Sequence, residues 1–489
     1  MAISAKDISN ARERMGNSIL RTPTIYSPGL SKMTGADIHL KLENQQVTSS
    51  FKPRGAFTRI EAMDKASARK GVIAMSAGNH AQAVAYHAFQ RSMPSVIVMP
   101  AQTPFSKVNR TRAWGAEVIL EGRDLNDCEA TVKSIMAKRG MTLIHPYDDP
   151  LVIIGQGSVG LELLQDISDL DTIIVPIGGG GLIAGIAVIA REMNPKVSLI
   201  GVEAALWPSM TQAINSNVMV CGGETLAEGI AVKSPGALTK PIIEKLVNEI
   251  LLVDEDHIER AISALVEQQR LVVEGAGAAG IAAILQYSNT FKGKRCGVVV
   301  CGGNIDSRLL AGVLTRSMAK DGRIARLRVD ISDEPGMLAS ISAAIGDCKG
   351  NIVEIFHQRM FHDVPAKLAK IDVVVETHGE EHINEIIAGI KKRNFKVAVL
   401  SDTQESTDGS TGWRHLAQST GGHFIHVESR NSDPLNRSLR DSYRSLNKAF
   451  RTRAIVDISI PTSKTEDDRE IAVRLTSPTH NKEVRHKIP

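Results

Sequence analysis

The sequence contains few cysteines, and none of them forms a closely spaced pair. Five occur in 489 residues, and they are scattered along the chain: Cys128, Cys221, Cys296, Cys301 and Cys348. Disulfide frameworks and zinc knuckles both need close pairs, so this scatter argues against either kind of site. We therefore expect a protein of a reducing, cytoplasmic compartment.

Concentrated charge of one sign is also missing. The chain has 58 Lys and Arg against 54 Asp and Glu, and its net charge of +4 is spread thinly. Nucleic-acid-binding proteins carry a basic stripe or patch, which this sequence lacks. We expect no nucleic-acid partner.

Long uninterrupted apolar runs are absent as well. The first 20 residues are charged and lack an apolar core, so we expect no secretory signal. The uncharged stretch Thr172–Ala190 is nearly long enough to span a bilayer, but Pro176 and four successive glycines divide it into a strand and a helix start. We expect a soluble chain with no membrane partner.

Residues 38–321 show a regular alternation of short β-branched runs and longer helical patterns. This alternation is typical of an α/β fold with open, mostly parallel sheets. Nine strands are too many for one small sheet, so we predict two lobes with a cleft between them. The predicted strands are Ile38–Leu42, Val72–Ser76, Ser95–Met99, Glu117–Leu120, Thr142–His145, Thr172–Ile177, Val197–Val202, Glu249–Val253 and Gly297–Cys301.

Three of these strands end in unusual loops, and ligands of open α/β sheets bind beyond the carboxyl ends of strands. Ser76–Gln82 is small and polar and opens a helix, which favours a carboxylate site on backbone N–H groups. Gly178–Gly181 forms a turn that would hold a phosphate with backbone amides alone. Cys301–Asn304 is a third tight loop.

Lys52 lies just after the polar run Thr48–Ser50 and an aromatic residue, and a proline follows it. Proline is best tolerated in the first turn of a helix, so we predict that Lys52 begins one. The positive end of the helix and a partly apolar setting would lower the pKa of Lys52 and favour a neutral, nucleophilic amine.

A phosphate-binding turn, a carboxylate-binding helix start and a lysine before proline together indicate a pyridoxal phosphate enzyme that acts on an amino acid. A nucleotide is a weaker alternative. No Gly-Lys-Ser/Thr follows Gly178–Gly181, and the Gly-x-Gly-x-x-Gly spacing of dinucleotide-binding proteins is absent. Lys52 would also have no purpose in a nucleotide-dependent oxidoreductase.

Four motifs stand in order along the first 320 residues: Ser50-Phe51-Lys52-x-Arg54-Gly55-Ala56, Ser76-Ala77-Gly78-Asn79-His80, Gly178–Gly181 and Gly302-Gly303-Asn304. In this order they resemble the motifs of the fold-type II pyridoxal phosphate enzymes, in particular the threonine dehydratases (threonine ammonia-lyases). The resemblance implies that Lys52 forms the internal aldimine, Phe51 packs beside the ring and Asn79 hydrogen-bonds the phenolic oxygen. It also implies a phosphate site made of Gly178, Gly179, Gly180, Gly181 and Leu182, and a Cys301 that faces the pyridine nitrogen.

The resemblance also implies a reaction, the dehydration and deamination of L-threonine, and of L-serine, to 2-oxobutanoate or pyruvate and ammonia, in isoleucine biosynthesis or threonine catabolism. Lys52 would remove the Cα proton, and the phosphate would protonate the departing hydroxyl. Ser76, Ala77, Gly78, Asn79 and His80 would bind the substrate. A thiol at Cys301 is a weak donor, so the pyridine nitrogen would stay mostly unprotonated and elimination would be favoured.

Two departures from related serine racemases sharpen this expectation. Those enzymes carry a second serine where this chain has Ala77, so we expect racemisation to be disfavoured. They also bind a divalent cation through acidic groups after the strand that here ends at Glu203. Ala204–Ser209 follows instead, so we expect no metal there.

Other polar residues of the motifs receive weaker interpretations. Glu274 is expected to cap the helix that begins at Gly275 rather than to act in catalysis. His80 is expected to orient or pack rather than to serve as a base. Arg54 either pairs with a carboxylate near the site or lies exposed, and Glu203 is read as a strand-end carboxylate.

Beyond Arg323 the pattern changes to a βαββαβ order that resembles an ACT domain, with strands at Ile324–Ile331, Asn351–Met360, Lys367–Val375 and Lys396–Leu400. Gly336 and Asn351 are candidate contacts for an amino-acid effector, and the alternative is a ferredoxin-like module used only for dimer contacts. Residues 401–489 are polar, and we expect them to be mostly disordered apart from possible strands at Ala454–Ile460 and Ile471–Leu475. The predicted domains are thus 1–321, 322–400 and 401–489.

Several functions remain open at this point. Within the enzyme class, the substrate is L-threonine or another hydroxy-amino acid such as serine or hydroxyaspartate, and residual racemisation is possible. From another class, the chain is a catalytically idle amino-acid sensor whose ACT-like module does the work. We expect a homodimer or homotetramer.

Overall fold

The computed structural model of the chain describes residues 3–124, 127–216, 221–358, 368–400, 455–459, 470–477 and 480–487. The chain divides into two compact units, Met1–Ser317 and Met318–Pro489. The first unit contains two separate sheets, as the count of predicted strands required.

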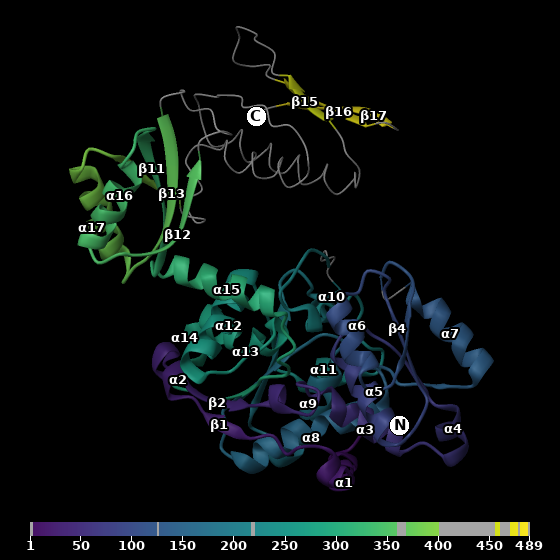
Figure 1. The fold of residues 1–489 in the computed structure, drawn as a ribbon. Helices are drawn as coiled ribbons and strands as arrows, with labels where there is room; N and C mark the ends of the chain where they lie inside the picture. Colours follow the sequence, from purple (N-terminus) through teal and green to yellow (C-terminus); the bar gives the residue numbers. More distant parts are fainter. Residues whose placement is uncertain are drawn as a thin grey trace. The chain divides into compact units, whose positions relative to one another are not determined.

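The larger lobe of the first unit is built on a six-stranded sheet (Figure 1). Its strands lie in the order β1 (Thr24–Tyr26), β2 (Asp37–Lys41), β10 (Arg295–Val299), β7 (Thr172–Pro176), β8 (Ser198–Ala204) and β9 (Glu249–Val253). All neighbours are parallel except β1 and β2. The carboxyl ends of β7 and β10 therefore meet at one edge, where their loops can share a ligand.

The smaller lobe has a four-stranded parallel sheet in the order β5 (Glu117–Leu120), β4 (Ser95–Met99), β3 (Val72–Met75) and β6 (Thr142–Leu143). Successive residues of β3 and β4 enter different cores, with Val72 and Ile97 in one and Ile73 and Val96 in the other. Side chains alternate across a strand, so this sheet is buried on both faces.

Helices cover these sheets and place their first turns at the strand ends. They are α1 (Ala5–Met15), α2 (Pro28–Thr34), α3 (Lys52–Glu61), α4 (Lys65–Lys70), α5 (Asn79–Gln90), α6 (Phe105–Arg112), α7 (Cys128–Arg139), α8 (Pro150–Asp166), α9 (Gly181–Met193), α10 (Ser209–Asn215), α11 (Thr239–Leu246), α12 (Glu255–Gln269), α13 (Gly275–Gln286), α14 (Ser288–Phe291) and α15 (Ser307–Lys320), with the short 3-10 helices η1 (Gly16–Ser18), η2 (Glu43–Gln45) and η3 (Glu228–Ile230). The uncharged stretch of the sequence is thus β7 followed by α9, both buried, as predicted.

Three of the predicted strands match the structure at both ends, and the other predicted strands differ from it by one or two residues at an end. Ser95–Met99, Glu117–Leu120 and Glu249–Val253 match at both ends. β10 begins two residues earlier than predicted because Arg295 pairs with Asp37 of β2 in the ladder and in an ion pair. β1 was not predicted, since a three-residue edge strand is defined by its pairing with β2 and not by any local pattern.

The second unit begins with a four-stranded antiparallel sheet in the order β12 (Asn351–Gln358), β13 (Leu368–Glu376), β11 (Ile324–Ser332) and β14 (Lys396–Val399). The helices α16 (Met337–Asp347) and α17 (Glu380–Lys392) pack on it and close a core with alternate residues of β11 and β13. The chain order is βαββαβ, which confirms the predicted architecture.

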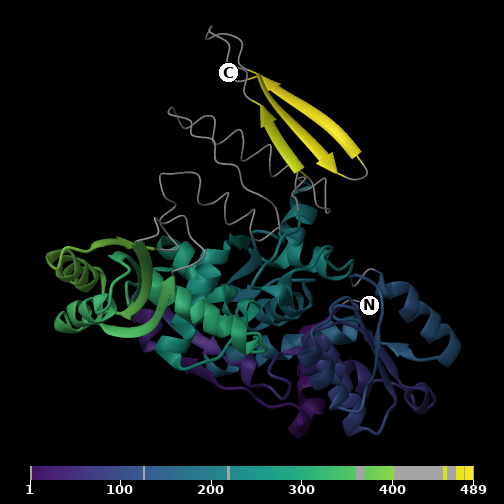
Figure 2. The ribbon, with the colours of Figure 1, turned by 45° about the horizontal axis from the view of Figure 1, so that its top comes forward.

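Three further strands are described near the C-terminus: β15 (Ile455–Ser459), β16 (Glu470–Ser477) and β17 (His480–Lys487). They form an antiparallel sheet of their own, drawn in yellow in Figure 2. The first two overlap the strands suspected from the sequence. The third, β17, was not predicted, and the expectation of disorder is wrong there because the segment pairs with β16. Over the rest of 401–489 that expectation falls on positions outside the described residues.

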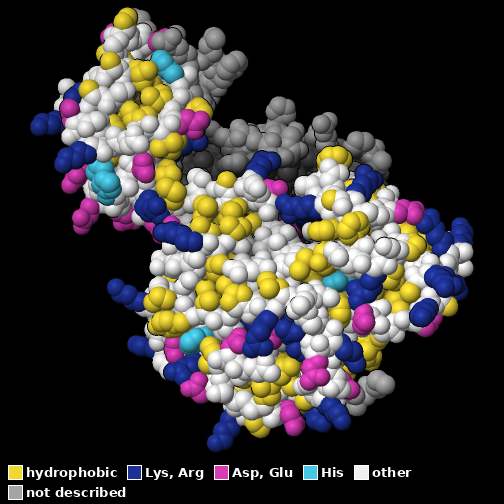
Figure 3. Space-filling model, turned by 60° about the horizontal axis from the view of Figure 1, so that its bottom comes forward, with side chains coloured by type: hydrophobic (Ala, Val, Ile, Leu, Met, Phe, Trp, Pro, Cys, Tyr) yellow, Lys and Arg dark blue, Asp and Glu magenta, His cyan; other side chains and the backbone are white. Residues whose placement is uncertain are grey.

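The surface shows no segregation of charge on the face drawn in Figure 3, where basic and acidic side chains are interspersed. None of the helices in the described part of the chain combines the length and the apolar character needed to cross a bilayer.

Candidate active site

Lys52 is the first residue of α3, with Pro53 in the first turn, as predicted. Its Nζ donates to the carbonyl oxygen of Pro146 at 2.8 Å and lies 5.0 Å from the centre of the Phe51 ring. Burial lowers the pKa of Lys52 to about 8, although electrostatic interactions with Cys301 and Glu274 act in the opposite direction. The direction agrees with the sequence expectation, and desolvation is the main cause.

The segment before Lys52 is tied to the loop after β10. Phe51 N donates to the carbonyl oxygen of Cys301 at 3.1 Å, and Ser50 forms an isolated β-bridge with Gly302. Cys301 is buried, and this burial raises the pKa of its thiol well above the ordinary value. The thiol therefore stays protonated next to Lys52.

The four glycines after β7 are closely packed, and two of them, Gly179 and Gly181, lie against Tyr147 in a way that only glycine permits. A Cβ on Gly179 would lie 2.2 Å from the Tyr147 ring, and Gly180 has a φ of +93°. Thr239 Oγ1 holds the turn by donating to the Gly179 carbonyl at 2.6 Å. Helix α9 then begins at Gly181 without a side-chain cap, which leaves its first N–H groups, including that of the buried Leu182, available to an anion.

Asn79 begins α5 and is held from two sides. Its Nδ2 donates to Glu274 Oε1 at 2.7 Å, and its Oδ1 accepts from Asn304 Nδ2 at 2.7 Å. Asn304 also donates to the Thr48 carbonyl. These contacts fix the amide orientation and leave the second Nδ2 hydrogen of Asn79 free to donate to a ligand.

The prediction that Glu274 caps α13 is wrong. The residue stands at the N-cap position, but its side chain accepts no hydrogen bond from the helix and turns to Asn79 instead. Burial raises the pKa of Glu274 to about 7, against the hydrogen bond from Asn79. The sequence could not show this contact, because Asn79 is 195 residues away.

The remaining residues of the Ser76–His80 motif lie at the carboxyl end of β3. Ser76 Oγ accepts a hydrogen bond from Gly78 N at 3.2 Å. Ala77 is partly buried against the core of the smaller lobe. A Cβ on Gly78 would meet nothing within 4 Å, so the space before α5 is open. The motif thus presents an uncapped helix start to that space.

His80 is buried, and its Nε2 lies 2.8 Å from the Ile144 carbonyl. Burial, with the nearby charge of Lys52, lowers the pKa of His80 to about 3. The ring is therefore neutral and carries its hydrogen on Nε2. Its Nδ1 has no partner among the described residues.

His145 and Tyr147, which follow β6, were missed by sequence reasoning. His145 Nδ1 accepts the N–H groups of Tyr147 and Asp148, and burial lowers the pKa of this histidine. The signal was present as His-Pro-Tyr-Asp-Asp after a predicted strand, but nothing local connects those residues to the glycine turn.

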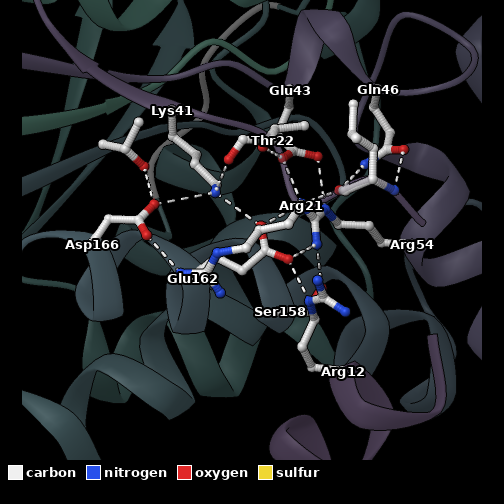
Figure 4. A network of polar contacts seen from close by, with 12 residues as sticks. Arg12, Arg21, Thr22, Lys41, Glu43, Gln46, Arg54, Ser158, Glu162 and Asp166 are labelled. Atoms are coloured by element: carbon white, nitrogen blue, oxygen red, sulfur yellow. Dashed lines mark hydrogen bonds and ion pairs between the residues drawn. The ribbon is translucent and has the colours of Figure 1, made fainter. Parts of the chain in front are cut away.

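Arg54, which the sequence left undecided, is fully buried, and Figure 4 shows its guanidinium between Glu43 and Glu162. Its guanidinium forms paired hydrogen bonds with Glu43 and with Glu162. Against the effect of burial, these carboxylates raise the pKa of Arg54. Of the two alternatives, pairing with carboxylates is therefore the correct one.

Glu203, at the end of β8, accepts from the N–H groups of Met210 and Thr211 and from the Thr211 hydroxyl. It thus holds the first turn of α10, and burial raises its pKa. Within the described residues, no group of three His, Cys, Asp or Glu side chains is arranged to hold a metal ion.

The two candidate effector residues lie at turns of the second unit. Gly336 precedes α16 with a φ of +92°, and a Cβ there would meet nothing within 4 Å. Asn351 opens β12, and its Nδ2 donates to Glu376 Oε2 at 3.1 Å.

Comparison with known proteins defines the class of this protein. Residues 16–302 match the pyridoxal-phosphate dependent enzymes, and residues 320–394 match the ACT domain. The first match covers more than half of the chain, so the chain belongs to the pyridoxal-phosphate dependent enzymes, in the fold-type II arrangement with a C-terminal ACT domain.

More particularly, the chain is similar to an L-threonine ammonia-lyase of Thermotoga maritima, with 40% identity over 400 residues, 81% of this chain and 100% of that one. It is 43% identical to an L-threonine ammonia-lyase of Geobacter sulfurreducens over 395 residues, 80% of this chain and 98% of that one. Among solved structures, a serine racemase of Dictyostelium discoideum superposes with a TM-score of 0.59 at 33% identity, covering 62% of this chain and 99% of that one.

The residues of the site fit pyridoxal phosphate. A lysine of lowered pKa suits an aldehyde, and the uncapped start of α9 beside glycine suits a phosphate. Two buried hydroxyls shortly before Lys52 in the chain, Thr48 Oγ1 and Ser50 Oγ, also have no partner within the described part of the chain. Such unpaired groups in a packed interior indicate a site built for a ligand.

Proposed function

We propose that the chain deaminates L-threonine, and L-serine, with pyridoxal phosphate and releases 2-oxobutanoate or pyruvate together with ammonia. Two relatives named L-threonine ammonia-lyase, similar over about four fifths of this chain, support this reaction. The observation that carries it is the position of Lys52, whose amine of lowered pKa lies among the loops that follow β6 and β10.

The roles follow from what each residue presents. Lys52 carries the cofactor, Phe51 packs beside its ring, and Asn79 donates its free amide hydrogen to it. The phosphate binds at Gly178, Gly179, Gly180, Gly181 and Leu182, and Cys301 lies at the pyridine end. The substrate carboxylate binds at the helix start formed by Ser76, Ala77, Gly78, Asn79 and His80, where free backbone N–H groups and the helix dipole favour an anion.

When bound, the cofactor supplies the sink for the electron pair left at Cα. Lys52 takes the Cα proton, and a pKa near 8 makes its neutral amine accessible at physiological pH. His80 does not compete for that proton, because burial lowers its pKa to about 3 and so makes its ring a much weaker base than the amine of Lys52. Asn79 is prevented from rotating by Glu274 and Asn304.

The test is an assay of 2-oxobutanoate from L-threonine with wild type, Lys52→Ala and Lys65→Ala. Lys65 is the matched control, because it also opens a helix, α4, but lies exposed. We expect Lys52→Ala to lose the product and the visible absorbance of the lysine-bound cofactor, and Lys65→Ala to keep both. Equal turnover in all three proteins, or none in wild type, contradicts the proposal.

A second candidate is a reaction on another hydroxy-amino acid, and the similarity to a serine racemase structure favours testing it. Racemisation needs an acid on the face of the cofactor opposite Lys52, and Ala77 offers none. Turnover of L-threonine, L-serine, D-serine and hydroxyaspartate, with chiral analysis of the amino acid left over, separates dehydration from racemisation.

We further propose that the ACT domain binds a branched-chain amino acid near Gly336 and Asn351 and regulates the enzyme, with domains 1–321, 322–400 and 401–489 in a cytoplasmic homodimer or homotetramer. Turnover is measured while valine, leucine or isoleucine is added to wild type and Asn351→Ala. Loss of the response in the variant alone supports the effector site. A non-catalytic amino-acid sensor is the competing idea, and a visible absorbance band that borohydride removes in wild type argues against it.

A further inference from the structure

The first turn of α3 has a second buried face, opposite to the one that carries Lys52. Arg54 and Lys41 are among the largest fully buried side chains of the described residues. The guanidinium of Arg54 donates to Glu43 at 2.8 Å through both Nε and Nη2, and to Glu162 at 2.9 Å and 2.8 Å. Ser158 Oγ and the Leu20 carbonyl accept further hydrogen bonds from it.

Glu162 is the centre of this network, and it gathers charge from three different elements (Figure 4). Besides Arg54 of α3, it pairs with Lys41 at the end of β2 at 2.8 Å and with Arg12 of α1 at 2.5 Å. Its side chain is fully buried. Although burial opposes ionisation, the hydrogen bond and charge of Arg54 lower the pKa of Glu162 to about 2, so the group is a carboxylate at neutral pH.

Lys52 lies in the short span between this network and a second anchor. On one side, Phe51 N is bonded to the Cys301 carbonyl. On the other side, two residues after Lys52, the guanidinium of Arg54 is held by paired hydrogen bonds to two carboxylates. Gly55 N also donates to Gln156 Oε1 at 3.2 Å. The first turn of α3 therefore has no freedom to slide along its axis.

The crossing of α3 and α8 makes this span tighter still. A Cβ on Gly155 would lie 2.5 Å from the Arg54 carbonyl and 2.7 Å from Gly55 Cα, so the two helix backbones touch. The carboxylate of Glu162 lies two turns further along α8. Helix α1 also packs on α8, where the Ile8 side chain lies against Gly157.

A buried ion network of this kind is a poor source of stability, because the desolvation of its charges offsets their attraction. Its distinguishing property is geometric, since paired guanidinium and carboxylate groups accept only one arrangement. That property matters where a side chain must be placed to within a fraction of an ångström, as a catalytic group must be.

We propose that Glu162 is a positioning residue for Lys52, acting through Arg54, and that α1 completes the arrangement through Arg12. This inference rests on the proposed role of Lys52 as the residue that carries the cofactor. The N-terminal helix thereby contributes to the reactivity of a lysine that it does not touch.

The experiment uses the full chain, freed of cofactor, and follows the rise of visible absorbance after pyridoxal phosphate is added. The variant is Glu162→Gln, which keeps the size of the side chain and removes the charge. The matched control is Asp372→Asn in the ACT domain, which also removes a fully buried carboxylate held by two arginines, Arg326 and Arg328. Urea unfolding of both variants measures the loss of stability directly.

We expect Glu162→Gln to attach the cofactor about tenfold more slowly than wild type and to lose at least as much in kcat at saturating cofactor and threonine, with a smaller change in KM. Asp372→Asn should attach the cofactor at the wild-type rate even though its own unit unfolds more easily. If both variants are slowed in proportion to their loss of stability, the network is structural only and the proposal fails.

Two more variants keep the test decisive if Glu162→Gln does not fold. Arg12→Met alters the partly exposed edge of the network, and we expect a slowing of about threefold in attachment with little change in stability. Arg54→Lys keeps the positive charge but cannot form the paired hydrogen bonds of a guanidinium. It should therefore be more stable than Arg54→Met, while its kcat should remain as low as in Arg54→Met. A wild-type attachment rate in Arg12→Met together with a wild-type kcat in Arg54→Lys overturns the positioning role, whereas absence of a Lys52-dependent band in wild type overturns the proposed function instead.

Discussion

Helix α3 carries two cations in its first turn, and the structure treats them in opposite ways. Burial lowers the pKa of Lys52 to about 8, while Glu43 and Glu162 raise that of Arg54 against the same effect of burial. Lys52 has one hydrogen-bond acceptor, the Pro146 carbonyl, whereas the donors of Arg54 reach two carboxylates, a hydroxyl and a carbonyl.

The surroundings of the two residues differ in the same sense. On the Arg54 side, each carboxylate is matched by cations. Thr48 Oγ1 and Ser50 Oγ, which precede Lys52 in the chain, and His80 Nδ1, whose ring the charge of Lys52 influences, have no partner among the described residues. Unpaired buried polar groups cost free energy, and they persist where a ligand completes them. The comparison indicates that the Arg54 face of this turn, the rigid face, fixes the backbone. The Lys52 face, the reactive face, is left open to a ligand.

The largest effect on stability is expected when the ion network of the rigid face is disrupted at Arg54. Arg54→Met would leave Glu43 and Glu162 buried without their main partner, and we expect a loss of about 3–5 kcal/mol in the free energy of unfolding of the first unit. Urea unfolding at neutral pH, followed by tryptophan fluorescence, measures it.

Arg59→Met is the matched control for that variant. Arg59 lies in the same helix and pairs with Asp149 at 3.0 Å, but both side chains remain partly exposed. Its loss should cost at most about 1 kcal/mol. A similar cost for the two variants would mean that the buried network is no more demanding than a surface pair.

The same comparison shows what the sequence could and could not reveal. The helix start at Lys52 was predicted correctly because a lysine before proline after a polar run is a local pattern, and the helix start at the glycine turn was predicted correctly for the same reason. Arg54 stayed undecided because Glu162, its partner, is 108 residues away. Glu274 was misassigned because its helix-start position is local, whereas its contact with Asn79 is not.

The next largest effect is expected in the pH dependence of stability, and it comes from Glu274, which accepts a hydrogen bond from Asn79 in the site. Its pKa is raised from 4.5 to about 7, so its contribution to stability is full below pH 4.5 and is lost as the pH rises through 7. Glu274→Gln keeps an acceptor for Asn79 and removes the titration. We expect wild type to lose up to about 3 kcal/mol relative to the variant between pH 5 and pH 8, measured by urea unfolding at both pH values.

The difference between the two proteins is the informative quantity, because other groups titrate as well. His80 and His87 have pKa values lowered to about 3 by burial, so they give the opposite slope, with stability rising as the pH rises through 6.5. These slopes cancel when the variant is subtracted from wild type. A difference that does not change with pH would show that Glu274 is ionised throughout.

Gly179→Ala tests whether the glycine turn after β7 tolerates a side-chain atom. The new Cβ would overlap the Tyr147 ring, and we expect the affinity for pyridoxal phosphate to fall about tenfold, or about 1.4 kcal/mol. Equilibrium dialysis with the cofactor measures the change. Truncating the ring with Tyr147→Ala in the same protein should recover most of the loss, whereas Gly346→Ala, in an open part of α16, should leave binding unchanged.

The smallest effect is expected at Cys301. Burial keeps its thiol protonated, and a thiol and a hydroxyl are both too weak as acids to place a proton on a pyridine nitrogen. Cys301→Ser should therefore keep threonine turnover within about threefold of wild type, because the chemistry depends on the amine of Lys52 and not on that nitrogen. Cys301→Asp is the contrasting variant, since a carboxylate at that position would favour a pyridinium. If serine rather than aspartate changes the ratio of elimination to racemisation, the reactive face depends on the Cys301 sulfur and not only on Lys52.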